Sequence, residues 1–185
     1  MSPVHTVVDE FRDLLEGRGK EPYGEQVTIA EHSLLTALAA TESGATDALV
    51  AACLLHDVGH WLDEPDDQYG IHSHDELGGD WVAERFGPEI SEPVRLHVAA
   101  KRYLCGVDPA YFDHLSPASV FTLTKQGGPM SAVAIVEFED NPHHDDAITL
   151  RKLEDDYGKR AGVDVPPLSR FAPLLLALTT TAGSG

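Results

Sequence analysis

Basic side chains are scarce in this chain of 185 residues. It has 13 lysines and arginines against 31 aspartates and glutamates, which gives a formal net charge of −18. A protein that coats a nucleic-acid backbone needs many cations to replace the counterions of the phosphates, so we expect no nucleic-acid partner. The acidity by itself indicates a well-solvated surface. An anionic substrate would need a local positive site, which gives the few basic residues near any motif unusual weight.

Cysteines and long apolar runs are also scarce. The two cysteines, Cys53 and Cys105, show neither a CxxC pattern nor metal-ligand spacing. We therefore expect no disulfide framework, and the reducing cytoplasm is the expected location. No apolar stretch reaches the roughly 20 residues that span a bilayer, and the first residues are too polar for a signal peptide. The sequence thus predicts no membrane partner.

Apolar residues recur at helical spacing along most of the chain, whereas the alternation typical of strands is essentially absent. The length suits one domain. We expect one all-α domain over residues 1–185, with its core at about 24–160 and a frayed tail at 179–185. The predicted helices cover about residues 4–16, 28–42, 46–60, 77–86, 92–103, 131–138 and 145–159, with a less regular stretch at 113–126 and a short last helix from Pro173.

The segment His56-Asp57-Val58-Gly59-His60 ends a run that is apolar nearly all round, which is typical of a buried helix. An unpaired aspartate in such a place would be costly, so it needs a partner. His56 and His60 share a helical face, and Asp57 is rotated from His56 by about 100°. A carboxylate there can bridge two metal ions while His56 binds one. The alternative is an aspartate satisfied by backbone groups beside a pair of surface histidines.

More donors of this kind occur along the chain, on successive predicted helices or just before them. They are His32, directly after a Thr28–Glu31 capping box, His74 with His72 beside it, His97, and Asp155 with Glu154 and Asp156 beside it. Each one alone has a simpler explanation as a helix cap, a core residue or an exposed side chain. Together, donors of mixed nitrogen and oxygen type suit a pair of transition metals such as iron or manganese, and the lack of thiolates argues against structural zinc.

The order of these residues resembles the HD-domain superfamily, which consists mostly of phosphohydrolases. The surrounding sequence is more similar to one oxygenase branch, the mixed-valent diiron oxygenases that cleave 1-hydroxyalkylphosphonates. This branch is typified by 2-amino-1-hydroxyethylphosphonate dioxygenase (glycine-forming), and myo-inositol oxygenase is a more distant relative. The matching stretches are Gly24–Thr28 with His32, Leu54–His60, His74–Gly78, His97–Leu104, Gln126–Met130 and Arg151–Lys159.

The resemblance implies a helical HD-domain bundle around a buried dinuclear site that holds an Fe(II)/Fe(III) pair. It implies that one iron is bound by His32, His56, Asp57 and Asp155, and the other by Asp57, His74 and His97, with open positions for substrate. His74 is preferred to His72 because Asp-Glu-Leu-Gly follows it. Asp155 is preferred because Lys159 lies four residues on, and Glu154 and Asp156 stay open as alternatives.

Several residues are candidates for binding the substrate. Lys101, one turn after His97, can meet a phosphonate, and either Arg151 or Lys152 can add a charge-assisted contact. Ser119 is a candidate hydroxyl donor. His60 can donate to the substrate or to a ligand carboxylate.

The entrance loop contains the one clear departure from the family pattern. Glu25 matches a glutamate that, in the family, covers the site or holds the amine of the substrate. The family typically has a tyrosine three residues before that glutamate, where it caps an open iron position. Here Tyr23 lies two residues before Glu25, and Pro22 holds the expected place.

The resemblance implies a dioxygenase that uses O₂ to cleave the C–P bond of a 1-hydroxyalkylphosphonate, giving a carboxylic acid and inorganic phosphate. The resemblance leaves open whether the other end of the substrate is an aminoethyl, a trimethylammonium or a bare methylene group. The sequence also leaves the oligomeric state open. The rival hypothesis is a metal-dependent phosphohydrolase acting on a nucleotide or small phosphate ester. A third is a binding or regulatory domain that has kept a metal site.

Overall fold

The computed structural model describes residues 6–23, 27–62, 74–158, 160 and 162–179. This part of the chain is almost entirely helical, which confirms the all-α prediction. The helices are α1 (Val7–Gly17), α2 (Ile29–Glu42), α3 (Asp47–Leu55), α4 (His74–Ala83), α5 (Pro88–Val107), α6 (Pro109–His114), α7 (Pro117–Lys125), α8 (Ala132–Glu139), α9 (His144–Asp156) and α10 (Ala172–Leu178), with 3₁₀ helices η1 (Val58–Trp61) and η2 (Leu168–Arg170). A short antiparallel pair, β1 (Pro22–Tyr23) and β2 (Val27–Thr28), was not predicted.

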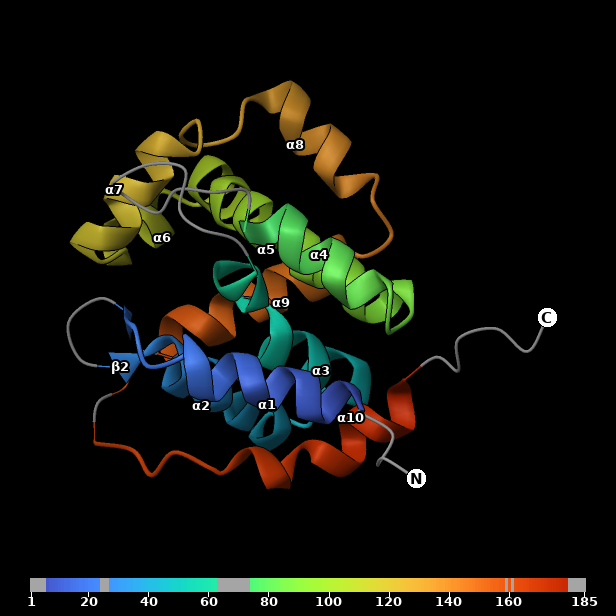
Figure 1. Ribbon diagram of the computed structural model, residues 1–185. Helices are drawn as coiled ribbons and strands as arrows, with labels where there is room; N and C mark the ends of the chain where they lie inside the picture. Colours follow the sequence, from blue (N-terminus) through green and yellow to red (C-terminus); the bar gives the residue numbers. More distant parts are fainter. Residues whose placement is uncertain (1–5, 24–26, 63–73, 159, 161, 180–185) are drawn as a thin grey trace, which may run out of the picture.

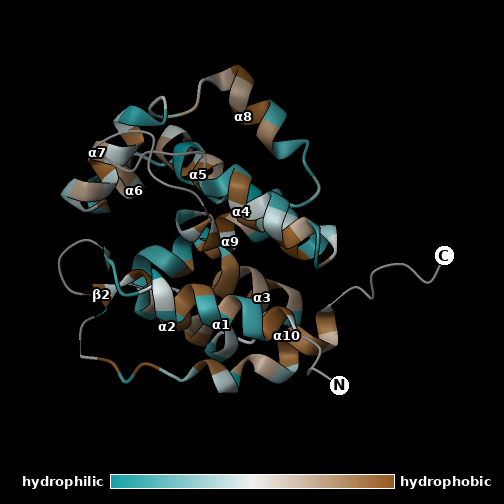
Figure 2. Cartoon of the chain, in the orientation of Figure 1, coloured by the Kyte–Doolittle hydropathy of each residue, from teal (hydrophilic) through white to brown (hydrophobic). Residues whose placement is uncertain are grey.

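Helix α3 lies at the centre of the fold. All of its side chains from Leu49 to Leu55 are buried, as its lack of a polar face predicts. Helices α2, α5, α9 and α10 contact it, and Figure 1 shows α9 running between a lower group of helices (α1, α2, α3 and α10) and an upper pair (α4 and α5). In Figure 2 hydrophobic segments line the interior around α3, while α4 and α5 carry prominent hydrophilic stretches. No helix of the described residues has the length and apolar character needed to cross a bilayer.

The start of α2 follows the predicted capping box. The backbone N–H of Glu31 donates to Thr28 Oγ1 (3.2 Å), and the backbone N–H of Thr28 donates to Glu31 Oε2 (2.8 Å). These two bonds satisfy amide groups that the first turn of a helix leaves unpaired. They fix the N-terminus of α2 and place His32 one turn inside it, where its side chain is fully buried.

The end of α3 differs from the prediction. The helix was expected to continue through His60, but it stops at Leu55, and Asp57 (φ −99°, ψ 8°) leaves the helical region before η1. The reason lies in the packing of Gly59 against α4, since an added Cβ there would lie 1.9 Å from the carbonyl oxygen of His74. The tighter 3₁₀ turn brings the backbone of η1 against α4, and this contact brings His74 next to Asp57.

The segment expected to be irregular, residues 113–126, contains the whole of α7 and the end of α6. Each of these helices has a proline in its first turn and a capping side chain before it, Asp108 for α6 and Ser116 for α7. Helix α5 is also longer than predicted, because it extends to Val107. These helices add Tyr111, Ser119 and Thr122 to the surroundings of the site.

Candidate metal centre

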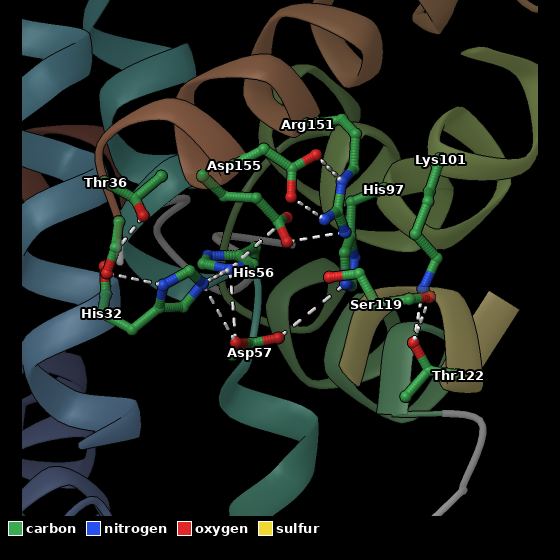
Figure 3. A network of polar contacts seen from close by, with 12 residues as sticks. His32, Thr36, His56, Asp57, His97, Lys101, Ser119, Thr122, Arg151 and Asp155 are labelled. Atoms are coloured by element: carbon green, nitrogen blue, oxygen red, sulfur yellow. Dashed lines mark hydrogen bonds and ion pairs between the residues drawn. The ribbon is translucent and has the colours of Figure 1, made fainter. Parts of the chain in front are cut away.

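Three of the predicted donors meet in the interior. The Nε2 atoms of His32 and His56 are 3.1 Å apart, and Oδ2 of Asp57 lies 3.6 Å from the first and 3.3 Å from the second. All three side chains are buried. Figure 3 shows them pointing toward one another from α2 and from the end of α3. They form a group that has the spacing to hold a metal ion.

The other ring nitrogens of these two histidines determine which atoms face this group. Nδ1 of His32 donates to the carbonyl oxygen of Gly158 (2.9 Å), and Nδ1 of His56 donates to that of Cys53 (2.8 Å). A carbonyl only accepts, so Nδ1 carries the proton in both rings, and Nε2 is free to act as a ligand. Backbone carbonyls therefore orient both rings with a donor nitrogen toward the same point.

A second group lies on the other side of Asp57. The Nε2 atoms of His74 and His97 are 3.2 Å apart, and Oδ1 of Asp57 is 3.9 Å and 3.8 Å from them, respectively. Nδ1 of His97 donates to the carbonyl oxygen of Val94 (2.6 Å), as in the first group. One oxygen of Asp57 thus faces each pair of histidines, which is the arrangement that a bridging carboxylate requires.

A further carboxylate completes the first group, and it comes from Glu154. This side chain is 1 % exposed, and its Oε2 lies 3.7 Å from Nε2 of His56. Neither this oxygen nor Oδ2 of Asp57 has a hydrogen-bond partner among the described residues. Buried carboxylate oxygens without donors are costly, and a bound cation would remove that cost.

Asp155, the residue preferred from the sequence, has different contacts. Its Oδ2 accepts from Nε of Arg151 (2.8 Å) and from the hydroxyl of Tyr111. Helix geometry explains the difference, because neighbouring side chains on α9 are rotated by about 100°. Position 154 faces the histidines while position 155 faces α6, so Glu154, one of the alternatives left open, is the acidic residue of α9 that lies next to the first group. Lys159, on which the choice of Asp155 rested, lies outside the described residues.

Two buried cations flank the histidine groups. Lys101 is 4 % exposed, and its Nζ donates to Thr122 Oγ1 (3.0 Å), which donates in turn to the carbonyl oxygen of Ser119 (3.1 Å). Arg151 is also 4 % exposed. Figure 3 shows Lys101, Ser119 and Thr122 together on one side of the histidine cluster, with Arg151 near His97. Predicted substrate residues thus gather around the cluster, and Thr122 joins them.

The other predicted residues have different surroundings. The ring of His60 stacks on that of His74 with centroids 4.0 Å apart, and its Nε2 lies 3.7 Å from Oδ1 of Asp57. Lys152 is exposed and lines a pocket between α6 and α9, so it is not part of the cluster. Glu25 and the side chain of Tyr23 lie outside the described residues.

The electrostatics of the cluster favour electron-pair donors. Burial, followed by the nearby charge of His56, lowers the pKa of His32 to about 4 and that of His97 to about 3. Burial alone would lower the pKa of His56 as well, but the carboxylates of Asp57 and Glu154 raise it to about 9. The same carboxylates that raise the pKa of His56 would favour a bound metal cation at this position.

Sequence reasoning missed two residues of this region, Tyr111 and Thr122. Thr122 lies in the stretch 113–126, which was expected to be irregular, and Tyr111 lies between that stretch and the helix predicted over 92–103. Ser119 and Thr122 are three residues apart, so a helical α7 would have put them on one face. The signal for α7 was Ser116 followed by proline at the first helical position.

The fold and this donor arrangement define the class of the protein. The model of the HD domain matches residues 29–116, a range that contains His32, His56, Asp57, His74 and His97. The hydrophobic run before His56-Asp57 and the succession of histidine-bearing helices are thus those of an HD domain.

Two curated relatives narrow the class. The chain is 40% identical to [1-hydroxy-2-(trimethylamino)ethyl]phosphonate dioxygenase (glycine-betaine-forming) of Leisingera caerulea, over 91% of this chain and 88% of the relative. It is 43% identical to hydroxymethylphosphonate dioxygenase of Gimesia maris, over 92% of this chain and 86% of the relative. The chain belongs to the family of HD-domain phosphonate dioxygenases.

Proposed function

We propose that this protein is a dioxygenase that cleaves the C–P bond of a 1-hydroxyalkylphosphonate at a diiron site. One O₂ is consumed for each molecule of carboxylic acid and inorganic phosphate released, so that all atoms balance. The observation that carries the proposal is the position of Asp57, whose two oxygens face two pairs of buried histidines. The similarity to two phosphonate dioxygenases over about nine-tenths of the chain supports it.

The donor set fits two iron ions. His32, His56, Asp57 and Glu154 would hold one ion, and His74 and His97 would hold the other together with Asp57. Nitrogen and oxygen donors without thiolate are typical of such non-heme iron sites. When bound as an Fe(II)/Fe(III) pair, the irons supply the redox chemistry that activates O₂ and oxidises the carbon next to phosphorus.

The protein contributes binding, orientation and exclusion of water. Lys101 and Arg151 supply positive charge beside the phosphonate, and the hydroxyls of Ser119 and Thr122 donate hydrogen bonds to its oxygens. Because both cations are buried, their contacts with an anion are stronger than they would be in water. His60, which lies beside Asp57 and His74, is placed to donate to the substrate from the same side.

The substrates for which the two relatives are named have a hydroxylated phosphonate group in common. One is named for a substrate with a trimethylammonium end and the other for a substrate with a bare methylene. We propose that the phosphonate and the 1-hydroxyl group are recognised in common, and that the entrance loop around Tyr23 and Glu25 selects the other end.

The test compares three compounds with the iron-loaded protein: hydroxymethylphosphonate, 2-amino-1-hydroxyethylphosphonate and 1-hydroxy-2-(trimethylamino)ethylphosphonate. We expect phosphate release and O₂ uptake in equal amounts with at least one of them, and no phosphate under strict anaerobiosis. An electron paramagnetic resonance signal of the mixed-valent pair should change with the same compound. Absence of turnover with all three compounds would contradict the proposal, and anaerobic phosphate release from a phosphate ester would favour the phosphohydrolase instead.

A further inference from the structure

Arg151 is shared between two carboxylates of its own helix. On one edge, its Nε donates to Oδ2 of Asp155 (2.8 Å) and its Nη2 donates to Oδ1 of the same residue. On the other edge, Nη1 is paired with Oε1 of Glu154 at 2.6 Å. The guanidinium therefore makes two contacts with Asp155 and one with Glu154.

This division matters for the second oxygen of Glu154. Oε2 has no hydrogen-bond partner among the described residues, and it lies 3.7 Å from Nε2 of His56. A guanidinium binds a carboxylate best through two parallel N–H···O contacts. If Arg151 took both oxygens of Glu154, Oε2 would leave the histidine side.

Asp155 is itself held in place. The hydroxyl of Tyr111 on α6 donates to Oδ2 of Asp155 and accepts from Nε of Arg151 (3.2 Å). The three side chains thus form a closed hydrogen-bonded triangle, and the partly exposed Asp155 lines a pocket of about 310 Å³ together with Tyr111. Arg151 is buried, so it cannot replace these contacts with water and would turn to another anion if they were removed.

We propose that Asp155, fixed by Tyr111, is a positioning residue that occupies one edge of Arg151 and thereby leaves Oε2 of Glu154 available to a metal ion. The proposal rests on the metal site of the proposed function. It gives the acidic pair Glu154-Asp155 two different roles: the first carboxylate binds metal, and the second limits how much of Arg151 the first can engage. Groups that orient a ligand in this way typically change metal affinity by about 10- to 100-fold when they are removed.

The experiment is a double-mutant cycle with metal affinity as the readout. Binding of Fe(II), with anaerobic chelator competition, is measured for the wild-type chain, Asp155→Asn, Arg151→Met and the double variant. We expect Asp155→Asn to weaken binding about tenfold in the presence of Arg151 and to have no further effect after Arg151→Met, since no guanidinium is then left to compete for Glu154. Tyr111→Phe, which removes only a hydroxyl, should weaken binding about two- to threefold, and Asp155→Glu should restore most of the affinity.

The controls separate this role from the alternatives. Asp156→Asn changes an exposed neighbour that lines the same pocket and should leave affinity unchanged. If Asp155→Asn weakens binding equally in both backgrounds, Asp155 is a ligand and the proposal is overturned, and wild-type affinity in Asp155→Asn overturns it too. Wild-type affinity in Glu154→Gln would overturn the metal role of Glu154 and this proposal with it. None of these results depends on O₂ uptake or phosphate release, so the proposed activity stands or fails by its own test.

Discussion

The two sides of the candidate active site carry opposite kinds of polar atoms. Around Asp57 and Glu154 the buried atoms are mostly acceptors, namely histidine Nε2 atoms and carboxylate oxygens that lack donors. Around Lys101 and Arg151 they are mostly donors. A site that is short of positive charge on one side and holds two buried cations on the other is complementary to metal ions and to an anion at the same time. This contrast explains how so acidic a protein can accommodate a phosphonate.

The strongest test of the acceptor side is Asp57→Asn. The amide keeps the shape of the carboxylate but removes the charge that faces both histidine pairs, so we expect both metal ions to be lost and activity to fall on the order of 1000-fold. Metal content by mass spectrometry and thermal unfolding check it. The matched change Asp156→Asn, at an exposed acidic residue, should retain metal and activity. An Asp57→Asn protein with a full metal complement would refute the bridging role.

On the donor side, the corresponding change is Lys101→Met. It removes one buried cation and keeps most of the side-chain volume. A hydrogen bond to a charged group contributes about 1.5–3 kcal/mol, so the KM for the phosphonate should rise roughly 10- to 100-fold while iron content stays unchanged. Lys125→Met, at an exposed lysine of α7, serves as the control. Loss of iron in Lys101→Met would show that the two sides are not separable.

A smaller effect is expected from Gly158→Ala, which acts on the acceptor side through packing. An added Cβ would lie 2.4 Å from Thr36 Oγ1 and 2.6 Å from the ring of His32. Overpacking of this kind costs about 1–3 kcal/mol, and displacement of His32 should weaken metal binding about tenfold. Gly17→Ala, where an added Cβ meets nothing within 4 Å, should lower neither the melting temperature nor metal affinity. Equal behaviour of the two variants would show that the position of His32 does not depend on this contact.

The smallest effect is expected from Thr122→Val, which removes one neutral hydroxyl from the donor side. We expect the KM to rise about three- to fivefold, in line with the loss of one ordinary hydrogen bond, with kcat little changed. Thr124→Val is a close control, because that hydroxyl also donates to a carbonyl one turn back but its side chain is exposed. If both variants have the same KM, Thr122 does not contact the substrate.

Most of the acceptor side could be predicted from the sequence, because its residues follow strong local signals. The apolar run before His56 indicates burial, and the Thr28–Glu31 capping box fixes where His32 lies in its helix. The choice between Glu154 and Asp155 could not be made in this way. It depends on how α9 is rotated about its axis as it packs against α3 and α5. The sequence of α9 is rich in charged residues, so it does not show which of the two adjacent acids faces the interior. Thr122 was missed because α7 is set by its cap and proline, with little hydrophobic periodicity of its own.

The contact between Gly59 and the backbone of His74 has a consequence for protein engineering. It joins η1, which follows Asp57, to the start of α4, which carries His74, through main-chain atoms. The distance between Asp57 and His74 therefore does not depend on the side chains around the proposed substrate site. Under the proposed function, substrate specificity can therefore be altered on α7 with little risk to the spacing of the histidine pairs. Any larger residue at Gly59 would push η1 and α4 apart and would disturb the metal centre whatever changes were made on α7.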